Sequence, residues 1–239
     1  MRVVISIGGS VLAPQLDPQR VERHAAVIES LATEGCELGV VVGGGGVARD
    51  YIRAARDLGA NEVQLDQLGI DVTRINARLL IAALGPRVDP KPAHTYEDAG
   101  DSIRRGDVSV MGGVSPGQTT DAVAAALAEY VNADLLIYAT SVDGVYSTDP
   151  NKESTAEKYE SLSASELVDV IGDIEMNAGA SAPVDLLAAK LIERSKMRTI
   201  VLDGTDPDRI EAAALRGVHS GTDIVPEGTN EDPSYWAQR

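Results

Sequence analysis

LGVVVGGGGVARDYIRAARDL, residues 38–58, is the stretch from which the fold class can be read. Its first five residues carry no polar side chain, and a short valine-rich run of this kind is typical of a strand buried on both faces of a parallel sheet. Four glycines follow at 43–46, and we expect a helix over about 47–58. The stretch therefore indicates strand, glycine turn and helix, the repeating unit of an α/β protein.

The same alternation extends outward in both directions. Predicted strands lie at 2–7, 38–42, 108–111, 135–139 and 199–202, and predicted helices lie at 18–34, 47–58, 68–84, 119–130 and 183–196. Asp-Gly and Asp-Pro pairs in TSVDGVYSTDP predict a hairpin or a loop across the sheet end at 140–150. We expect an α/β sandwich with one domain over residues 1–225. The polar tail at 226–239 is predicted to be flexible, with Trp236 peripheral.

Composition excludes several classes of function. The 239 residues carry a net charge of −16, which opposes unaided binding to a nucleic acid polymer or an anionic membrane. A single cysteine excludes an intramolecular disulfide or a zinc cage built from cysteines, and Cys36 is expected to be an inert core residue. The amino-terminal residues are typical of a strand and not of a signal peptide, and no apolar run reaches the ~18 residues of a membrane span. We predict a soluble, cytoplasmic protein.

The acidity is also unusual in kind. There are 16 arginines but only 5 lysines, and phenylalanine is absent. A surface rich in carboxylates over a core of small residues favours adaptation to high salt, where ions screen the self-repulsion. The alternative is an ordinary acidic protein from a GC-rich genome.

Three glycine-rich turns, at 8–10, 43–46 and 112–117, each follow a predicted strand. Ligands of open α/β sheets bind beyond the carboxyl ends of the strands, and free N–H groups at a helix start receive anions. Tight strand–helix corners also need glycine for steric reasons alone. The three turns together favour a phosphate-rich ligand, while the incomplete P-loop and GxGxxG patterns argue against P-loop kinases and Rossmann dehydrogenases.

Several polar residues near these turns have both a structural and a functional interpretation. Thr or Asp in the segment 112–121 suits a helix cap, and the same segment offers donors to a phosphate. Asp143 and Asp149 suit turn formation. Asp66 suits a helix cap or a ribose acceptor. Arg49, one turn into a helix, suits a solvated surface position or a phosphate contact.

Four motifs in order resemble the amino-acid kinase superfamily, and within it the archaeal-type uridylate kinases. They are IGGSVL at 7–12, VVGGGGVAR at 41–49, MGGVSPGQTTDAVAA at 111–125 and TSVDGVYSTDP at 140–150. The resemblance covers about residues 1–222. It implies an open αβα sandwich with a mainly parallel sheet, and phosphoryl transfer from ATP with Mg²⁺ to UMP, giving UDP and ADP in pyrimidine nucleotide synthesis. It further implies a homohexamer, with the acceptor mainly on the amino-terminal part and ATP mainly on the carboxyl-terminal part.

The resemblance also assigns residues. The implied catalytic residues are Asp143, placed to orient Mg²⁺ or neighbouring groups, and Arg49. The implied ATP-binding residues are Gly9, Ser10, Gly45, Arg49, Thr140, Ser141, Tyr146 and Asp149, with Ser141 standing where the family often has asparagine. The implied UMP-binding residues are Gly44, Asp66, Val114, Ser115, Pro116, Gly117, Gln118, Thr119 and Thr120. No metal ligands are assigned.

One departure concerns the first strand, where many superfamily members carry a lysine just before the Gly-Gly turn. This chain has Ile5-Ser6-Ile7 there, and archaeal-type members also tend to lack the lysine. Charge stabilisation must come from Arg49, Mg²⁺ or backbone amides, with Lys190 a weaker candidate. Two alternatives stay open: a kinase of the same fold for acetylglutamate, another carboxylate or isopentenyl phosphate, and a nucleotide-binding storage or regulatory protein without catalysis.

Overall fold

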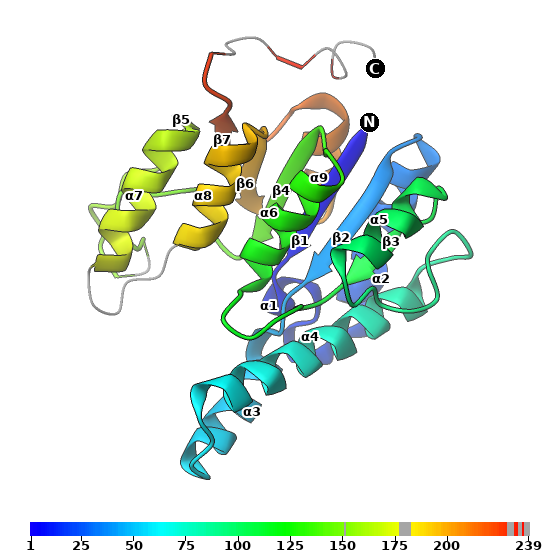
Figure 1. The fold of residues 1–239 in the computed structure, drawn as a ribbon. Helices are drawn as coiled ribbons and strands as arrows, with labels where there is room; N and C mark the ends of the chain where they lie inside the picture. The colour runs from blue at the N-terminus through cyan, green and yellow to red at the C-terminus, as the bar shows by residue number, and fades with distance from the viewer. Residues whose placement is uncertain (151, 177–182, 229–231, 234–235, 237–239) are drawn as a thin grey trace.

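One seven-stranded sheet runs through the centre of the molecule (Figure 1). The computed structural model describes residues 1–150, 152–176, 183–228, 232–233 and 236. The strands are β1 (Arg2–Ile7), β2 (Glu37–Val42), β3 (Ser109–Met111), β4 (Leu135–Thr140), β5 (Ser161–Ser163), β6 (Thr199–Asp203) and β7 (Thr222–Val225). Their order is β3-β2-β1-β4-β6-β7-β5, and only the β6–β7 pair is antiparallel. The predicted mainly parallel sheet is confirmed.

The central strand β1 fixes where the ligand-binding edge lies. It pairs in parallel with β2 as far as Ile7 and Val42, and with β4 as far as Ile7 and Ala139. Its residues from Val3 to Ile7 are all buried, as expected for a strand covered on both faces. The carboxyl ends of β1, β2 and β4 therefore come level with one another at the same edge of the sheet.

Helices cover both faces of the sheet and complete the predicted αβα sandwich. They are α1 (Gly9–Leu12), η1 (Pro14–Leu16), α2 (Pro18–Thr33), α3 (Gly45–Asp57), α4 (Glu62–Ala83), α5 (Tyr96–Arg104), α6 (Thr120–Tyr130), α7 (Ala164–Met176), α8 (Leu186–Ser195) and α9 (Asp208–Arg216). Alternate residues of β1 separate the two cores: Val3 and Ile5 pack with α2 and α9, whereas Val4 packs with α5 to α8. The outer ends of α3 and α4 extend away from the sheet (Figure 1).

Two predicted helices have different starting points in the structure. Helix α4 begins at Glu62, before the predicted residue 68, because Asn61 and Gln64 form a capping box at distances of 3.1 and 2.9 Å. Helix α8 begins at Leu186, after the predicted residue 183, because the Asp185 carboxylate accepts the Ala188 N–H at 2.9 Å. In both cases a side-chain cap outweighs the periodicity of the apolar residues.

Some elements have no counterpart in the sequence-based prediction. They are α1, η1, α5, α7, α9, β5 and β7. Strand β5 has three residues and β7 has four, too few for a clear period of two, and α9 begins without a side-chain cap. Of the predicted hairpin or loop at 140–150, the structure shows a loop after Thr140, and Tyr146 in this loop forms an antiparallel bridge with Lys158, beyond the predicted segment.

Trp236 corrects the expectation of a peripheral side chain. Its indole N–H donates to the Ala214 carbonyl at 3.1 Å, and the Arg198 guanidinium lies 4.8 Å from the ring centroid. The ring packs on Gly217, where an added Cβ would lie 2.6 Å from it, so the absence of a side chain there makes the contact possible. Most of the rest of the tail predicted to be flexible, 226–239, lies outside the described residues.

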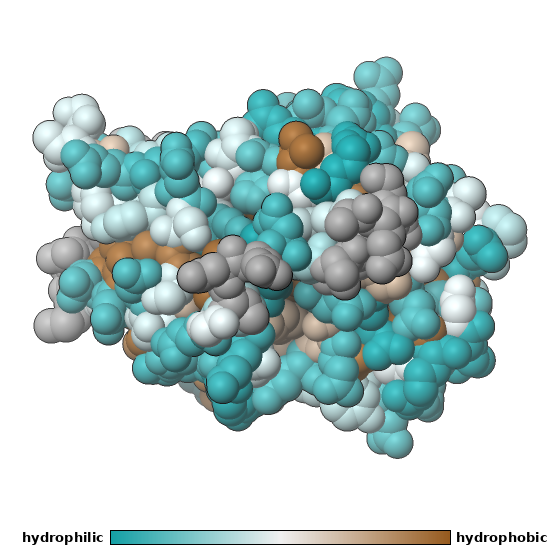
Figure 2. Space-filling view, turned by 90° about the horizontal axis from the view of Figure 1, so that it is seen from above, coloured by the Kyte–Doolittle hydropathy of each residue, from teal (hydrophilic) through white to brown (hydrophobic). Residues whose placement is uncertain are grey.

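Figure 2 shows hydrophilic residues over most of the face that it draws. Among the described residues, no helix combines the length and apolar character needed to cross a membrane.

Candidate active site

Two glycine turns lie back to back at the carboxyl ends of β1 and β2. The Gly43 N–H donates to the Ile7 carbonyl at 2.9 Å, which draws the turn after β2 against the end of β1. A Cβ on Gly9 would lie 2.3 Å from the Gly45 nitrogen, and Gly45 has a φ of +63°. Only glycine fits at Gly9 and suits Gly45, so the close approach of the two backbones explains this part of both motifs.

A pocket of about 360 Å³ opens beside these turns. Its walls come from the ends of β1, β2 and β4, from the start of α6 and from the loop after β4. The lining residues are Ser6, Gly8, Gly9, Ser10, Val11, Gly43, Gly44, Gly45, Arg49, Thr120, Asp121, Ala139, Thr140, Ser141, Val142, Gly144, Tyr146, Thr148, Asp149, Pro150, Ile174 and Pro183. They include every residue predicted to bind ATP, although the sequence separates the first from the last by 140 positions.

Two helices direct backbone N–H groups to this edge of the sheet. Helix α3 begins at Gly45 after the N-cap Gly44, and α6 begins at Thr120 after the N-cap Thr119. The Thr119 hydroxyl accepts the Ala122 N–H at 3.1 Å, which confirms the predicted threonine cap, whereas Gly44 has no side chain to cap α3. The first N–H groups of α3 are therefore available to an anion.

Asp121 is the acidic group that the sequence analysis did not single out. It lies in the first turn of α6 and lines the pocket, with the Ser6 hydroxyl 3.4 Å from its carboxylate. Burial, together with the negative charge of Asp185, raises the pKa of Asp121 to about 7. The sequence offered one signal, an aspartate opening an Ala-rich helix after two threonines, but its burial depends on the tertiary packing.

Arg49 supplies positive charge at the same pocket. It is exposed on α3, four residues after the start of the helix, and it lines the pocket. Within the described ranges no ion pair engages it, whereas Arg53 on the same helix pairs with Asp50 at 3.3 Å. Lys190, the weaker candidate cation, instead pairs with Glu193 at 3.0 Å on the exposed surface of α8.

The predicted acceptor residues gather against α4. Asp66 lies inside this helix and is not its cap; its carboxylate accepts the Gly117 N–H at 2.8 Å across 51 residues of sequence. Thr73, two turns further along, accepts the Gly113 N–H at 2.7 Å. The structure thus brings Asp66 to the 114–120 segment. Of the predicted UMP-binding residues, Gly44 and Thr120 line the pocket itself.

The end of β4 and the segment after it carry four of the residues predicted to bind ATP: Thr140, Ser141, Tyr146 and Asp149. Asp149 is 5% exposed, and its carboxylate lies 3.7 Å from the Lys152 ammonium. The aspartate that was expected to form a turn is therefore also buried and paired with a lysine. Thr140 turns the chain by accepting the Val142 N–H at 3.1 Å. Their binding roles stay predictions.

The Asp143 carboxylate is engaged elsewhere. It accepts the Tyr146 hydroxyl at 2.7 Å and the Lys158 ammonium at 3.0 Å, and Asp143 is not among the residues that line the pocket. Burial acts to raise the pKa of Asp143, but the hydrogen bonds from Tyr146 and Lys158 outweigh it and lower the pKa below its ordinary value. A catalytic role for Asp143 remains a prediction, and the geometry places Asp121 closer to the pocket.

Fold and site together define an α/β protein that binds a phosphate-bearing ligand beyond the carboxyl ends of parallel strands. The family model "Amino acid kinase family" matches residues 1–203, and the chain belongs to this family. The predicted superfamily and fold class are confirmed.

Similar proteins place the chain within a smaller group of this family. A protein from Haloquadratum walsbyi named uridylate kinase is 71% identical, over 99% of this chain and 98% of its own length. A uridylate kinase from Halobacterium salinarum is 67% identical over the same shares. The crystal structure of uridylate kinase from Archaeoglobus fulgidus matches with a TM-score of 0.84 at 45% identity, covering 94% of this chain and all of that one. The resemblance to archaeal-type uridylate kinases is thereby confirmed.

Proposed function

We propose that this protein is a nucleoside monophosphate kinase, which transfers the γ-phosphoryl group of ATP to UMP and releases UDP and ADP. The observation that carries the proposal is the single pocket in which glycine turns, Arg49 and Asp121 meet. Full-length similarity at 71% identity to a protein named uridylate kinase supports UMP as the acceptor. The product would serve pyrimidine nucleotide synthesis.

Phosphoryl transfer needs alignment and charge neutralisation more than covalent chemistry. The N–H groups of the Gly9 and Gly45 turns would hold the ATP phosphates, and Arg49 would neutralise charge that develops between donor and acceptor. The acceptor UMP would lie against the surface that Asp66 and the 114–120 segment form together, on the side that Gly44 and Thr120 border. The oxygen that attacks belongs to the UMP phosphate, so the enzyme supplies no nucleophile.

Mg²⁺ would complete the site. Magnesium in kinases is held mainly by substrate phosphates, waters and one or two carboxylates. The described residues contain no cluster of three potential ligands, and Asp121 is a carboxyl group that faces the pocket, so the donor set fits a metal brought in with ATP. Bound there, Mg²⁺ would neutralise phosphate charge in place of the absent first-strand lysine. Asp121 would hold it, because its carboxyl group lines the pocket.

The arrangement of the chain follows from this proposal. We propose one domain over residues 1–225, with the acceptor served mainly by the amino-terminal part and ATP by the carboxyl-terminal part. A cytoplasmic location would give it access to both nucleotides. We also propose a homohexamer. Exposed apolar side chains on α3 and α4, among them Tyr51, Ile75 and Leu79, support self-association.

The test is a panel of acceptors with purified protein in molar KCl and Mg²⁺. UMP is expected to give stoichiometric ADP release, while acetylglutamate and isopentenyl phosphate give none. ADP release with one of those acceptors and not with UMP would show that the protein is a kinase of the same fold for that acceptor. Tight ATP binding without turnover on any acceptor would establish a storage or regulatory protein.

A further inference from the structure

The loop after β4 is held as one arm of a short antiparallel hairpin. Tyr146 bridges to Lys158, the Ser147 N–H donates to the Glu157 carbonyl at 2.9 Å, and the Tyr159 N–H donates to the Val145 carbonyl at 3.0 Å. Tyr146 and Lys158 are therefore opposite neighbours. Their side chains both meet the carboxylate that precedes the hairpin.

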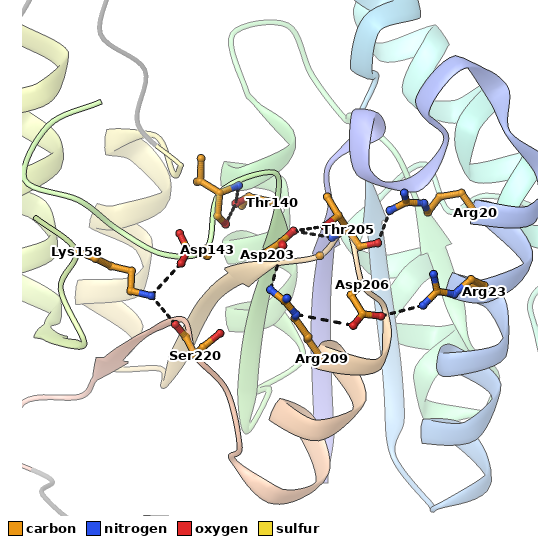
Figure 3. Close-up of polar contacts among 12 residues, drawn as sticks. Arg20, Arg23, Thr140, Asp143, Lys158, Asp203, Thr205, Asp206, Arg209 and Ser220 are labelled. Atoms are coloured by element: carbon orange, nitrogen blue, oxygen red, sulfur yellow. Dashed lines mark hydrogen bonds and ion pairs between the residues drawn. The ribbon is translucent and has the colours of Figure 1, made fainter. Parts of the chain in front are cut away.

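Asp143 uses both of its carboxylate oxygens in these contacts. Oδ1 accepts the Tyr146 hydroxyl at 2.7 Å, and Oδ2 accepts the Lys158 ammonium at 3.0 Å. The same ammonium donates to the Ser220 carbonyl at 2.8 Å, so Lys158 links the loop to the segment that enters β7 (Figure 3). Three segments that are distant in sequence thus meet at one lysine.

Packing behind the loop supports the same link. The Thr222 hydroxyl accepts the Val145 N–H at 2.8 Å and donates to the Tyr159 carbonyl at 2.6 Å. Gly144 lies so close that an added Cβ would be 2.6 Å from the Thr222 hydroxyl and 3.1 Å from the Lys158 side chain. The backbone at Gly144 is thereby fixed against β7.

Only part of this network reaches the pocket. Tyr146 and Gly144 line it, while Asp143 and Lys158 do not belong to its lining residues. The Asp143 carboxylate is 44% exposed and the Lys158 side chain 27% exposed, so both reach solvent outside the pocket lining to which Tyr146 belongs. This geometry suits a support of the wall better than a contact with the reacting phosphates.

We propose that Lys158, acting through Asp143, is a positioning residue that sets the Tyr146 ring against the donor nucleotide. This inference rests on the proposed function, since it takes the pocket to be the ATP site. It changes the expected role of Asp143, which then governs the binding of ATP and leaves the phosphoryl-transfer step alone. The tyrosine hydroxyl, the carboxylate and the ammonium act as one unit.

Steady-state kinetics in molar KCl separate the two roles of Asp143. Lys158→Met, Asp143→Asn and Tyr146→Phe are each expected to raise KM for ATP about five- to tenfold, with kcat and KM for UMP changing less than about twofold. Lys158→Arg keeps a cation that reaches the carboxylate and should restore KM to within about twofold of the wild type. Because the residues form one unit, Tyr146→Phe combined with Lys158→Met should raise KM little beyond either single change.

Arg194→Met provides a matched control. Arg194 forms a comparable long-range pair with Glu129, between α8 and α6, and lies away from the pocket; its removal should leave KM for ATP unchanged. Equilibrium binding of a non-hydrolysable ATP analogue to the same variants gives a readout that is independent of turnover. Failure of the proposed function, seen as a wild type inactive towards UMP, is thereby distinguished from failure of the positioning role. A fall in kcat for Asp143→Asn at unchanged KM, or wild-type affinity in Lys158→Met, would overturn the proposal.

Discussion

The Ser6 hydroxyl lies 3.4 Å from the Asp121 carboxylate, so β1 meets the first turn of α6 two residues before the first glycine turn. Ser6 is uncharged, and the segment 5–7 just before the first glycine turn contains no lysine. In the described part of the chain no ion pair engages the Asp121 carboxyl group, which lines the pocket and lies near the negative charge of Asp185. The elevated pKa of Asp121 follows from this arrangement.

Asp121 should make stability depend on pH. Its pKa is raised from 3.8 to about 7 in the folded protein, so between these values the folded state holds a proton that the unfolded state releases. The bound proton stabilises the folded state. Its contribution to the free energy of unfolding is complete below pH ~4, falls as the pH rises and is lost above pH ~7. Denaturant unfolding across this range should show a smaller decline for Asp121→Asn than for the wild type. Parallel pH profiles of the two proteins would remove Asp121 from this account.

Arg49 should act on the chemical step. Arg49→Met is expected to lower kcat by about a hundredfold, the scale of one removed transition-state contact, with little change in the unfolding midpoint. Arg53→Met, one turn along α3, removes an exposed arginine that pairs with Asp50 and should leave kcat unaltered. Equal losses in both variants would point to a general effect of charge on α3.

The contact of the two glycine turns should not tolerate a methyl group. Gly9→Ala places a Cβ 2.3 Å from the Gly45 nitrogen, so we expect a loss of about 1–3 kcal/mol in the free energy of unfolding and weakened ATP binding. Gly46→Ala is the control, because its Cβ would meet only the end of the Arg49 side chain, at 4.0 Å. Thermal unfolding and nucleotide titration of both variants provide the measurement. Wild-type stability of Gly9→Ala would refute the steric argument.

Asp66 should affect the binding of UMP and leave the binding of ATP unchanged. Removing its carboxylate in Asp66→Ala leaves the Gly117 N–H without its acceptor and loosens the 114–120 segment, so KM for UMP should rise about tenfold while KM for ATP holds. Asp71→Ala, on the same helix and bonded only to Gln67 at 3.3 Å, is the comparison. A rise in KM for ATP instead would assign Asp66 to the donor side.

The sequence predicted the glycine turns and the central strands because both are local patterns. The sequence itself shows the four buried valines and isoleucines of β1 and the glycines that follow them. The residues predicted to bind ATP come together because parallel strands end at the same edge of the sheet. Asp121 was missed because its environment depends on Ser6 and Asp185, residues 115 and 64 positions away. Asp143 was predicted to be catalytic from its motif, but the side chain that holds its carboxylate, Lys158, lies beyond that motif.

Salt should stabilise the protein. With a net charge of −16, self-repulsion destabilises the compact state at low ionic strength, and molar KCl shortens the screening length to ~3 Å. Both the unfolding midpoint and the activity are expected to rise with KCl, and the named relatives from halophilic archaea support this expectation. Titration with sorbitol separates screening from general solute effects. Equal stability in dilute buffer would indicate an ordinary acidic protein.

The proposed function requires ATP and UMP to meet at one pocket for direct phosphoryl transfer. The most direct measurement incubates the protein with γ-³²P-labelled ATP, Mg²⁺ and molar KCl, with and without UMP, and separates the products. We predict label in UDP, only when UMP is present, and label transfer about a hundredfold slower in Arg49→Met. Label released as inorganic phosphate, or no label transferred to UMP by folded wild-type protein, would contradict the account.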